Sequence, residues 1–246
     1  MLVRDAGEAW QIVLQTDHAD LCAELARAWR PRPEPFGSVL TATERHDDGW
    51  AVWEQAPLVE PETGRPLNFL DVPVPAHLTF YRACIAAVSD QDPYAGLLIS
   101  MHGAGIYRQR YGTDLALSLT RAAEVAEQVE EFVAEQEASH PVRLAATGHS
   151  DDERWADYHL LQLYDRLSLY FCMRDVENGE SWEIGDYRLA PLGPWRVTVD
   201  PYPFVDSPAR FSLVRRLVPK RARTQSEFPA EFFALAAERV EITVEA

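Results

Sequence analysis

Positive charge and lysine are scarce in this chain of 246 residues. Lysine and arginine together number 23 against 39 aspartates and glutamates, Lys220 is the only lysine, and the formal net charge is −16. A surface of that sign repels both nucleic-acid backbones and anionic membranes. The composition therefore argues against both as partners and leaves a small molecule, a metal or another protein, with the oligomeric state undetermined.

Cysteine and long apolar runs are also rare. The three cysteines, Cys22, Cys84 and Cys172, lie far apart in apolar surroundings and form no CxxC pair, which is typical of buried thiols in a reducing compartment. The N-terminal segment is charged throughout, and no later stretch is apolar enough for a membrane span. We therefore expect a cytoplasmic protein.

What the chain does have is a 47% hydrophobic composition and strong helical periodicity. A short strand at "AWQIVLQ" should precede a helix over residues 18–29 that Thr16 or Asp17 can N-cap. Further helices are expected over residues 37–45, 76–91, 114–140, 151–175 and 227–238, with a proline-rich loop over residues 53–75. Another helix should begin near residue 92, carry His102 and end near Gly103 to Gly105. Alternating segments over residues 179–205, 209–219 and 239–246 predict strands.

This order predicts an α+β fold that is mostly α. Residues 1–175 would form a helical body with a short N-terminal strand, and residues 176–246 a β-rich extension packed on the same core. The N-terminal strand is a candidate member of the C-terminal sheet.

The stretch "TERHDDGW" places His46, Asp47 and Asp48 side by side where a helix should end. Adjacent helical residues point about 100° apart, so a His and an Asp in sequence converge only at a helix end or around a bound ion. Asp165 lies in the middle of a very apolar helix, where a carboxylate is costly to bury without a partner. His18 falls on the buried face of the first helix, and His102 lies on a later one. A divalent cation would explain all of these positions together.

Each position also has a simpler explanation. His18 can be a hydrogen-bonded core residue, the His46-Asp47 doublet a helix cap, and Asp165 the partner of an arginine. His102 can end its helix before Gly103. The acidic helix around residues 117–137 is most simply a solvated face, and the remaining histidines, at positions 77, 140, 149 and 159, ordinary surface residues.

The order of His18, His46-Asp47 and a distant Asp165 in "LYDRLSLYF" resembles the HD-domain superfamily of metal-dependent phosphohydrolases, which are all-helical proteins. The resemblance covers residues 16–173. It implies an HD-like helical body and a site for one or two divalent transition metal ions, of Mn, Fe, Ni, Co or Zn. His18, His46, Asp47 and Asp165 would be ligands, and His102 a ligand to a second metal or to the substrate.

The function implied is a metal-dependent hydrolase of a phosphorylated small molecule or nucleotide. Asp47 and Asp48 would act in catalysis, and His102 and Trp50 would line the substrate site. The chain departs from the usual motif in Asp48, Gly49 and Trp50, which follow the doublet. Two alternatives remain open: a di-iron oxygenase of the same superfamily, and a non-catalytic binding or structural protein with a degenerate metal site. Over its whole length the chain also resembles a family of uncharacterised bacterial proteins with the landmarks "HD-GW" and "D-LSLY-C".

Overall fold

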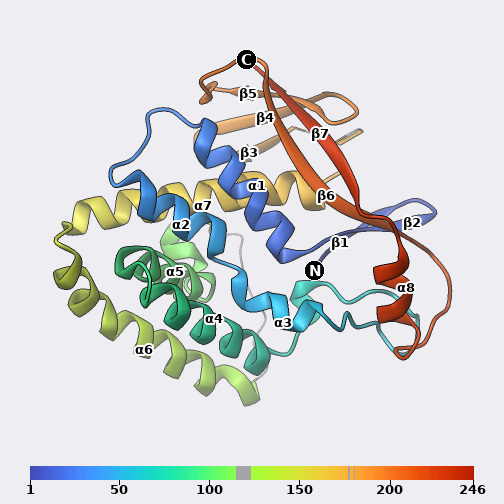
Figure 1. Ribbon diagram of the computed structural model, residues 1–246, viewed down its shortest axis with the longest axis horizontal. Helices are drawn as coiled ribbons and strands as arrows, with labels where there is room; N and C mark the ends of the chain where they lie inside the picture. The colour runs from blue at the N-terminus through green and yellow to red at the C-terminus, as the bar shows by residue number, and fades with distance from the viewer. Residues whose placement is uncertain (115–122, 177, 180) are drawn as a thin grey trace. The chain divides into compact units, whose positions relative to one another are not determined.

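The chain folds into two compact units, each assembled from segments distant in sequence. The computed structural model (Figure 1) describes residues 1–114, 123–176, 178–179 and 181–246. The first unit, here called the sheet unit, comprises Met1–Pro31, Trp50–Val72 and Asp165–Ala246. The second, the helical unit, comprises Arg32–Gly49 and Pro73–Tyr164.

The sheet unit is built on a seven-stranded sheet with the order β1-β2-β6-β7-β5-β4-β3. Neighbouring strands pair antiparallel except β5 and β7, which are parallel, so the sheet is mixed. In Figure 1 the long strands β6 and β7 run through its centre in orange and red. The strands are β1 Leu2–Ala6, β2 Ala9–Val13, β3 Trp182–Ile184, β4 Tyr187–Gly193, β5 Arg196–Asp200, β6 Ala209–Pro219 and β7 Glu238–Glu245.

The expected fold class, mostly α with an HD-like helical body and a β extension, is wrong. The finding that overturns it is the extent of the sheet, which joins both ends of the chain in a mixed α/β fold: β2 pairs with β6, with Ile12 opposite Arg216. Strand β1 exists because Gly7, at φ +75°, closes a hairpin in which its N–H donates to the Asp5 carboxylate at 2.9 Å. The strand expected at "AWQIVLQ" is β2, and it is a member of the C-terminal sheet as anticipated.

Helix α1 (Gln15–Ala28) packs on β6 and begins one turn earlier than its sequence suggests. Neither Thr16 nor Asp17 caps it. The residue at the N-cap is Leu14, and the N–H of Gln15 donates to the Glu54 carboxylate at 2.9 Å. A carboxylate at a helix N-terminus also interacts favourably with the helix dipole, so a residue distant in sequence replaces the local cap.

Shorter elements complete the sheet unit. Glu54 ends α3 (Ala51–Glu54), and the proline-rich segment also contains the 3-10 helix η2 (Phe69–Asp71), which Asn68 caps. Helix α8 (Phe228–Ala234) packs Phe228 and Phe232 against Ile12 and Val218. The sheet unit therefore has its own apolar core.

The helical unit surrounds α5 (Pro93–Ile106) with α2 (Phe36–Arg45), α4 (Val74–Ser89) and α6 (Ala123–Thr147). Asp92 caps α5 by accepting N–H groups of its first turn, and Pro93 follows at the first helical position. Nearly every residue of α5 is buried, as expected of a helix that is apolar on all sides. His102 therefore lies in the core of this unit.

Helix α7 (Asp151–Met173) belongs to both units, because residues 151–164 are part of the helical unit and Asp165 begins the part in the sheet unit. The predicted acidic helix corresponds to α6, and its residues 115–122 lie outside the described part of the chain. Among the described residues, we find no helix with the length and apolar character needed to cross a membrane.

Candidate metal centre

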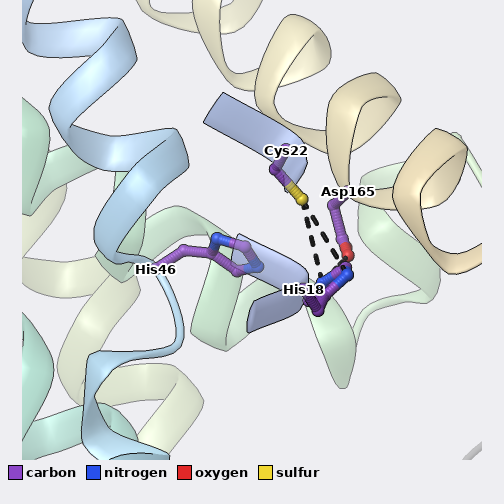
Figure 2. A group of neighbouring side chains, drawn as sticks. All are labelled: His18, Cys22, His46 and Asp165. Atoms are coloured by element: carbon purple, nitrogen blue, oxygen red, sulfur yellow. Dashed lines mark hydrogen bonds and ion pairs between the residues drawn. The ribbon is translucent and has the colours of Figure 1, made fainter. Parts of the chain in front are cut away.

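His18 on α1 and Asp165 on α7 face each other in the interior of the sheet unit (Figure 2). His18 Nε2 lies 3.0 Å from Asp165 Oδ1, and the two side chains are 1% and 3% exposed. His18 reaches this position because it lies on the apolar face of α1, one turn before Cys22. The sequence places these two residues far apart, and the fold brings them into contact.

Ser168, one turn beyond Asp165 on α7, determines which nitrogen of His18 carries hydrogen. The Ser168 hydroxyl donates to the His18 carbonyl at 3.1 Å, and its Oγ lies 2.5 Å from His18 Nδ1. Because the hydroxyl proton is already donated, Oγ accepts a hydrogen bond from Nδ1–H. Neutral His18 therefore presents the lone pair of Nε2 to a carboxylate oxygen, a contact that is repulsive unless a proton or a metal cation lies at Nε2.

Cys22 is a third potential metal ligand in the sheet unit, and it was not among the predicted ligands. Its Sγ lies 3.9 Å from both ring nitrogens of His18. The potential metal-ligating atoms of His18, Cys22 and Asp165 all lie within 4.8 Å of one another. Figure 2 shows these three side chains pointing toward one another. The spacing of His18 and Cys22, four residues apart on one helix, was the signal that could have identified the thiol.

A second buried pair of histidine and aspartate, His46 and Asp47, lies in the helical unit at the end of α2. His46 is the C-cap residue of α2, and its Nδ1–H donates to the Thr43 carbonyl at 2.8 Å. A carbonyl can only accept, so neutral His46 has its lone pair on Nε2, which lies 3.4 Å from Asp47 Oδ2. Both side chains are buried. The helix end therefore makes the adjacent His and Asp converge, as the sequence pattern required.

The rest of the "HDDGW" turn fixes the backbone at this point. A Cβ on Gly49 would lie 2.2 Å from the carbonyl oxygen of Phe80 on α4, so only glycine fits. The Cys84 thiol donates to the Arg45 carbonyl at 3.1 Å, and burial raises the pKa of Cys84 to about 12, which keeps it protonated. Asp48 binds Arg45 at 2.7 Å with a side chain 40% exposed.

His102 lies beside the doublet in the helical unit. The donor atoms of His46, Asp47 and His102 lie within 4.8 Å of one another. Tyr81 of α4 bridges two of these residues, since its hydroxyl lies 3.1 Å from Asp47 Oδ1 and 3.3 Å from His102 Nε2. On the other side of the ring, Gln162 Nε2 lies 3.0 Å from His102 Nδ1.

The structure thus brings together His18 with Asp165, and His46 with Asp47 and His102, each group within one unit. Asp48 lies at the end of α2 in an ion pair, and Trp50 is buried within the sheet unit. Sequence reasoning missed the polar neighbours Ser168, Tyr81 and Gln162. Ser168 was detectable from its spacing of three residues to Asp165, whereas Tyr81 and Gln162 have no such signal.

Two histidines expected at the surface are buried instead. His77 Nδ1 lies 2.5 Å from the Tyr107 hydroxyl, and His140 Nε2 lies 3.1 Å from Ser100 Oγ. Burial lowers the pKa of His77 and of His140 to about 4. These side chains are neutral core residues near neutral pH, and each contacts a buried hydroxyl group.

Comparison with known protein families gives a match over most of the chain. The model of a family described as "Protein of unknown function (DUF3891)" matches residues 1–220. No curated protein matches the chain, and no solved structure matches it.

Proposed function

Because the chain belongs to DUF3891, a family of unknown function, we propose its function from its own residues: a metal-dependent hydrolase of a phosphorylated small molecule or nucleotide. One observation carries the proposal. His18 and His46 each have Nδ1–H held by an oxygen acceptor and Nε2 next to a carboxylate oxygen. A neutral histidine with one nitrogen held in this way is the usual form of a metal-ligating histidine.

The donor set fits a divalent transition metal. Each unit supplies one neutral imidazole and one carboxylate, His18 with Asp165 in the sheet unit and His46 with Asp47 in the helical unit, and such nitrogen and oxygen ligands suit Mn, Fe, Co, Ni or Zn. The buried thiol of Cys22 lies among these donors in the sheet unit and favours the softer metals of this group. When bound, such an ion supplies Lewis acidity and generates a nucleophile at neutral pH.

The residues around the doublet support the phosphoryl substrate. The motif order of His18, His46-Asp47 and Asp165 resembles that of the HD phosphohydrolases, and this likeness selects the reaction class. With one lysine in the chain, arginine is the available side chain for a phosphate. Arg45 and Asp48 flank the doublet and are partly exposed, so Arg45 can bind a phosphate oxygen and Asp48 can accept a proton. The buried free thiols fit a reducing compartment, and we place the protein in the cytoplasm.

The test measures metal content and phosphatase activity together. Elemental analysis of the parent protein is compared with two double variants, His18→Ala/Asp165→Asn and His46→Ala/Asp47→Asn, and with the exposed control His159→Ala. We expect bound transition metal and metal-dependent hydrolysis of p-nitrophenyl phosphate or bis-p-nitrophenyl phosphate in the parent and the control. Both double variants should lose the activity.

The metal count also separates the alternatives. Complete loss of metal from both variants indicates one shared centre, and partial loss from each indicates two ions. A parent protein with no metal, and with stability unchanged by added metal, would overturn the proposal in favour of a non-catalytic module. Two equivalents of iron with substrate-dependent O₂ consumption and no ester hydrolysis would overturn it in favour of an oxygenase.

A further inference from the structure

We infer that Asp47 is oriented by a chain of buried hydrogen bonds that starts at Arg110 and runs through Gln162, His102 and Tyr81. In this arrangement Tyr81 and His102 are positioning residues that act on the metal through Asp47. The inference rests on the proposed metal-binding role of Asp47, and it gives His102 a different role from the ligand role that the sequence suggested.

The direction of the first two hydrogen bonds follows from Arg110, because a guanidinium can only donate. Arg110 Nη1 donates to Gln162 Oε1, which assigns the amide and directs Nε2 of Gln162 towards His102 Nδ1 at 3.0 Å. An amide NH₂ donates, so Nδ1 of His102 must hold a lone pair. The hydrogen of His102 therefore lies on Nε2.

Tyr81 connects His102 to Asp47. His102 Nε2–H donates to the Tyr81 oxygen at 3.3 Å, and the Tyr81 hydroxyl donates to Asp47 Oδ1 at 3.1 Å. Each of these four hydrogen bonds then joins one donor to one acceptor, and the series ends at the Asp47 carboxylate. The series has a cation at one end and an anion at the other, and all of its hydrogen bonds run in the same direction. In a buried environment such hydrogen bonds polarise and strengthen one another.

The protein holds the members of this chain tightly. All five side chains are buried: Asp47, Tyr81, His102, Arg110 and Gln162. Arg110 enters the interior from a turn in which it and its two neighbours, Gln109 and Tyr111, have left-handed φ angles of 51° to 52°. Residues other than glycine adopt this conformation only when the surrounding structure imposes it. On α5, a Cβ at Gly103 would lie 3.0 Å from the Tyr81 ring, so glycine leaves the room that the tyrosine occupies.

The hydrogen-bond chain determines which oxygen of Asp47 is available to a metal. Tyr81 engages Oδ1 of Asp47, so Oδ2, which lies 3.4 Å from His46 Nε2, is the oxygen that faces the histidine lone pair. Asp47 would then bind metal through one oxygen. His102 has one nitrogen facing an amide donor and the other donating to Tyr81, so it is not itself a ligand.

Metal titration of the metal-free protein with Co²⁺ or Zn²⁺ tests this role. Tyr81→Phe removes the hydroxyl and keeps the ring, and we expect metal affinity to fall about 10–100-fold with stoichiometry unchanged. Tyr94→Phe is the matched control, because Tyr94 is equally buried in the helical unit and donates to Asp157 at 2.8 Å. It should leave metal affinity unchanged. Parent-like affinity in Tyr81→Phe, with one metal equivalent lost in His102→Ala, would overturn the inference and make His102 a ligand.

A second measurement needs no metal. In protein labelled with ¹⁵N-histidine, NMR of the metal-free parent should show His102 protonated at Nε2 and not at Nδ1. Gln162→Glu replaces the amide donor by an acceptor, so Nδ1 of His102 should become protonated in that variant. A parent in which Nδ1 carries the hydrogen would overturn the inference. If the parent binds no metal, the proposed function fails, and these spectra alone still decide whether the hydrogen-bond chain exists.

Discussion

His18 Nε2 and Asp165 Oδ1 lie 3.0 Å apart in an interior almost closed to solvent, and Ser168 holds the opposite nitrogen of the ring. This contact is favourable when a proton or a metal ion lies at Nε2. His46 and Asp47 repeat the relationship, with the Thr43 carbonyl in place of the hydroxyl.

Replacement of Ser168 tests the orientation of His18. Ser168→Ala should weaken metal binding about 10–100-fold, because the ring loses the acceptor that fixes its tautomer. It should also lower the free energy of unfolding of the metal-free protein by about 1–2 kcal/mol. Ser100→Ala is the control: Ser100 is also fully buried and hydrogen-bonded, so it should cost similar stability without altering metal affinity. Equal affinities in all three proteins would contradict a role for Ser168.

Removal of metal should destabilise the protein through Asp165. If metal is present at 100 times its dissociation constant, chelation should lower the free energy of unfolding by about 2.7 kcal/mol. Before chelation, the Asp165→Asn variant should already have a lower free energy of unfolding than the parent. EDTA should not lower this value further. Asp157→Asn, at a buried aspartate that accepts from Tyr94, should retain the response. Urea denaturation with and without chelator measures both effects, and an EDTA response in Asp165→Asn equal to that of the parent would rule out Asp165 as a ligand.

Much of the local structure could be predicted because it depends on short-range periodicity. The helix carrying His18, the helix end at His46 and the apolar helix around Asp165 all follow from the spacing of apolar residues. The sheet could not be predicted in the same way. The pairing of Ile12 with Arg216 depends on contacts between the two ends of the chain, and no local pattern specifies it.

The polar neighbours of the site were missed for a different reason. Ser168 could have been found from its spacing to Asp165, but a tyrosine or glutamine such as Tyr81 or Gln162 looks like any other residue of its helix, and only its partner reveals its role. Sequence position was also misleading for His77 and His140, which were expected at the surface because they lie in predicted loops or at polar helix positions. Their partners Tyr107 and Ser100 satisfy them in the interior, and these contacts form only in the folded chain.

The glycine of "HDDGW" gives a prediction about the fold around His46. Gly49→Ala should lower the free energy of unfolding by about 1–3 kcal/mol or more, because the new methyl group would meet the backbone of Phe80. Gly37→Ala is the matched control, since Gly37 lies in α2 with no atom near its Cβ position. It should stabilise the protein by about 0.5–1 kcal/mol through helix propensity. Urea denaturation of both variants distinguishes a packing requirement from a general effect of alanine, and equal effects would refute the steric argument.

His140 should make stability depend on pH in a definite direction. Burial lowers its folded pKa from 6.5 to about 4, so the unfolded chain binds a proton between these values and the folded protein does not. The contribution of neutral His140 to the free energy of unfolding is fully present above pH 6.5. It decreases by about 2–3 kcal/mol as the pH falls towards 4. His77 has the same sign, so His140→Gln should remove only part of the dependence. Glutamine retains an N–H for Ser100, so parent and variant should be similar at pH 7.5. Urea denaturation at pH 7.5 and pH 5 measures the difference, and an unchanged pH dependence in the variant would show that His140 takes up its proton in the folded protein as readily as in the unfolded chain.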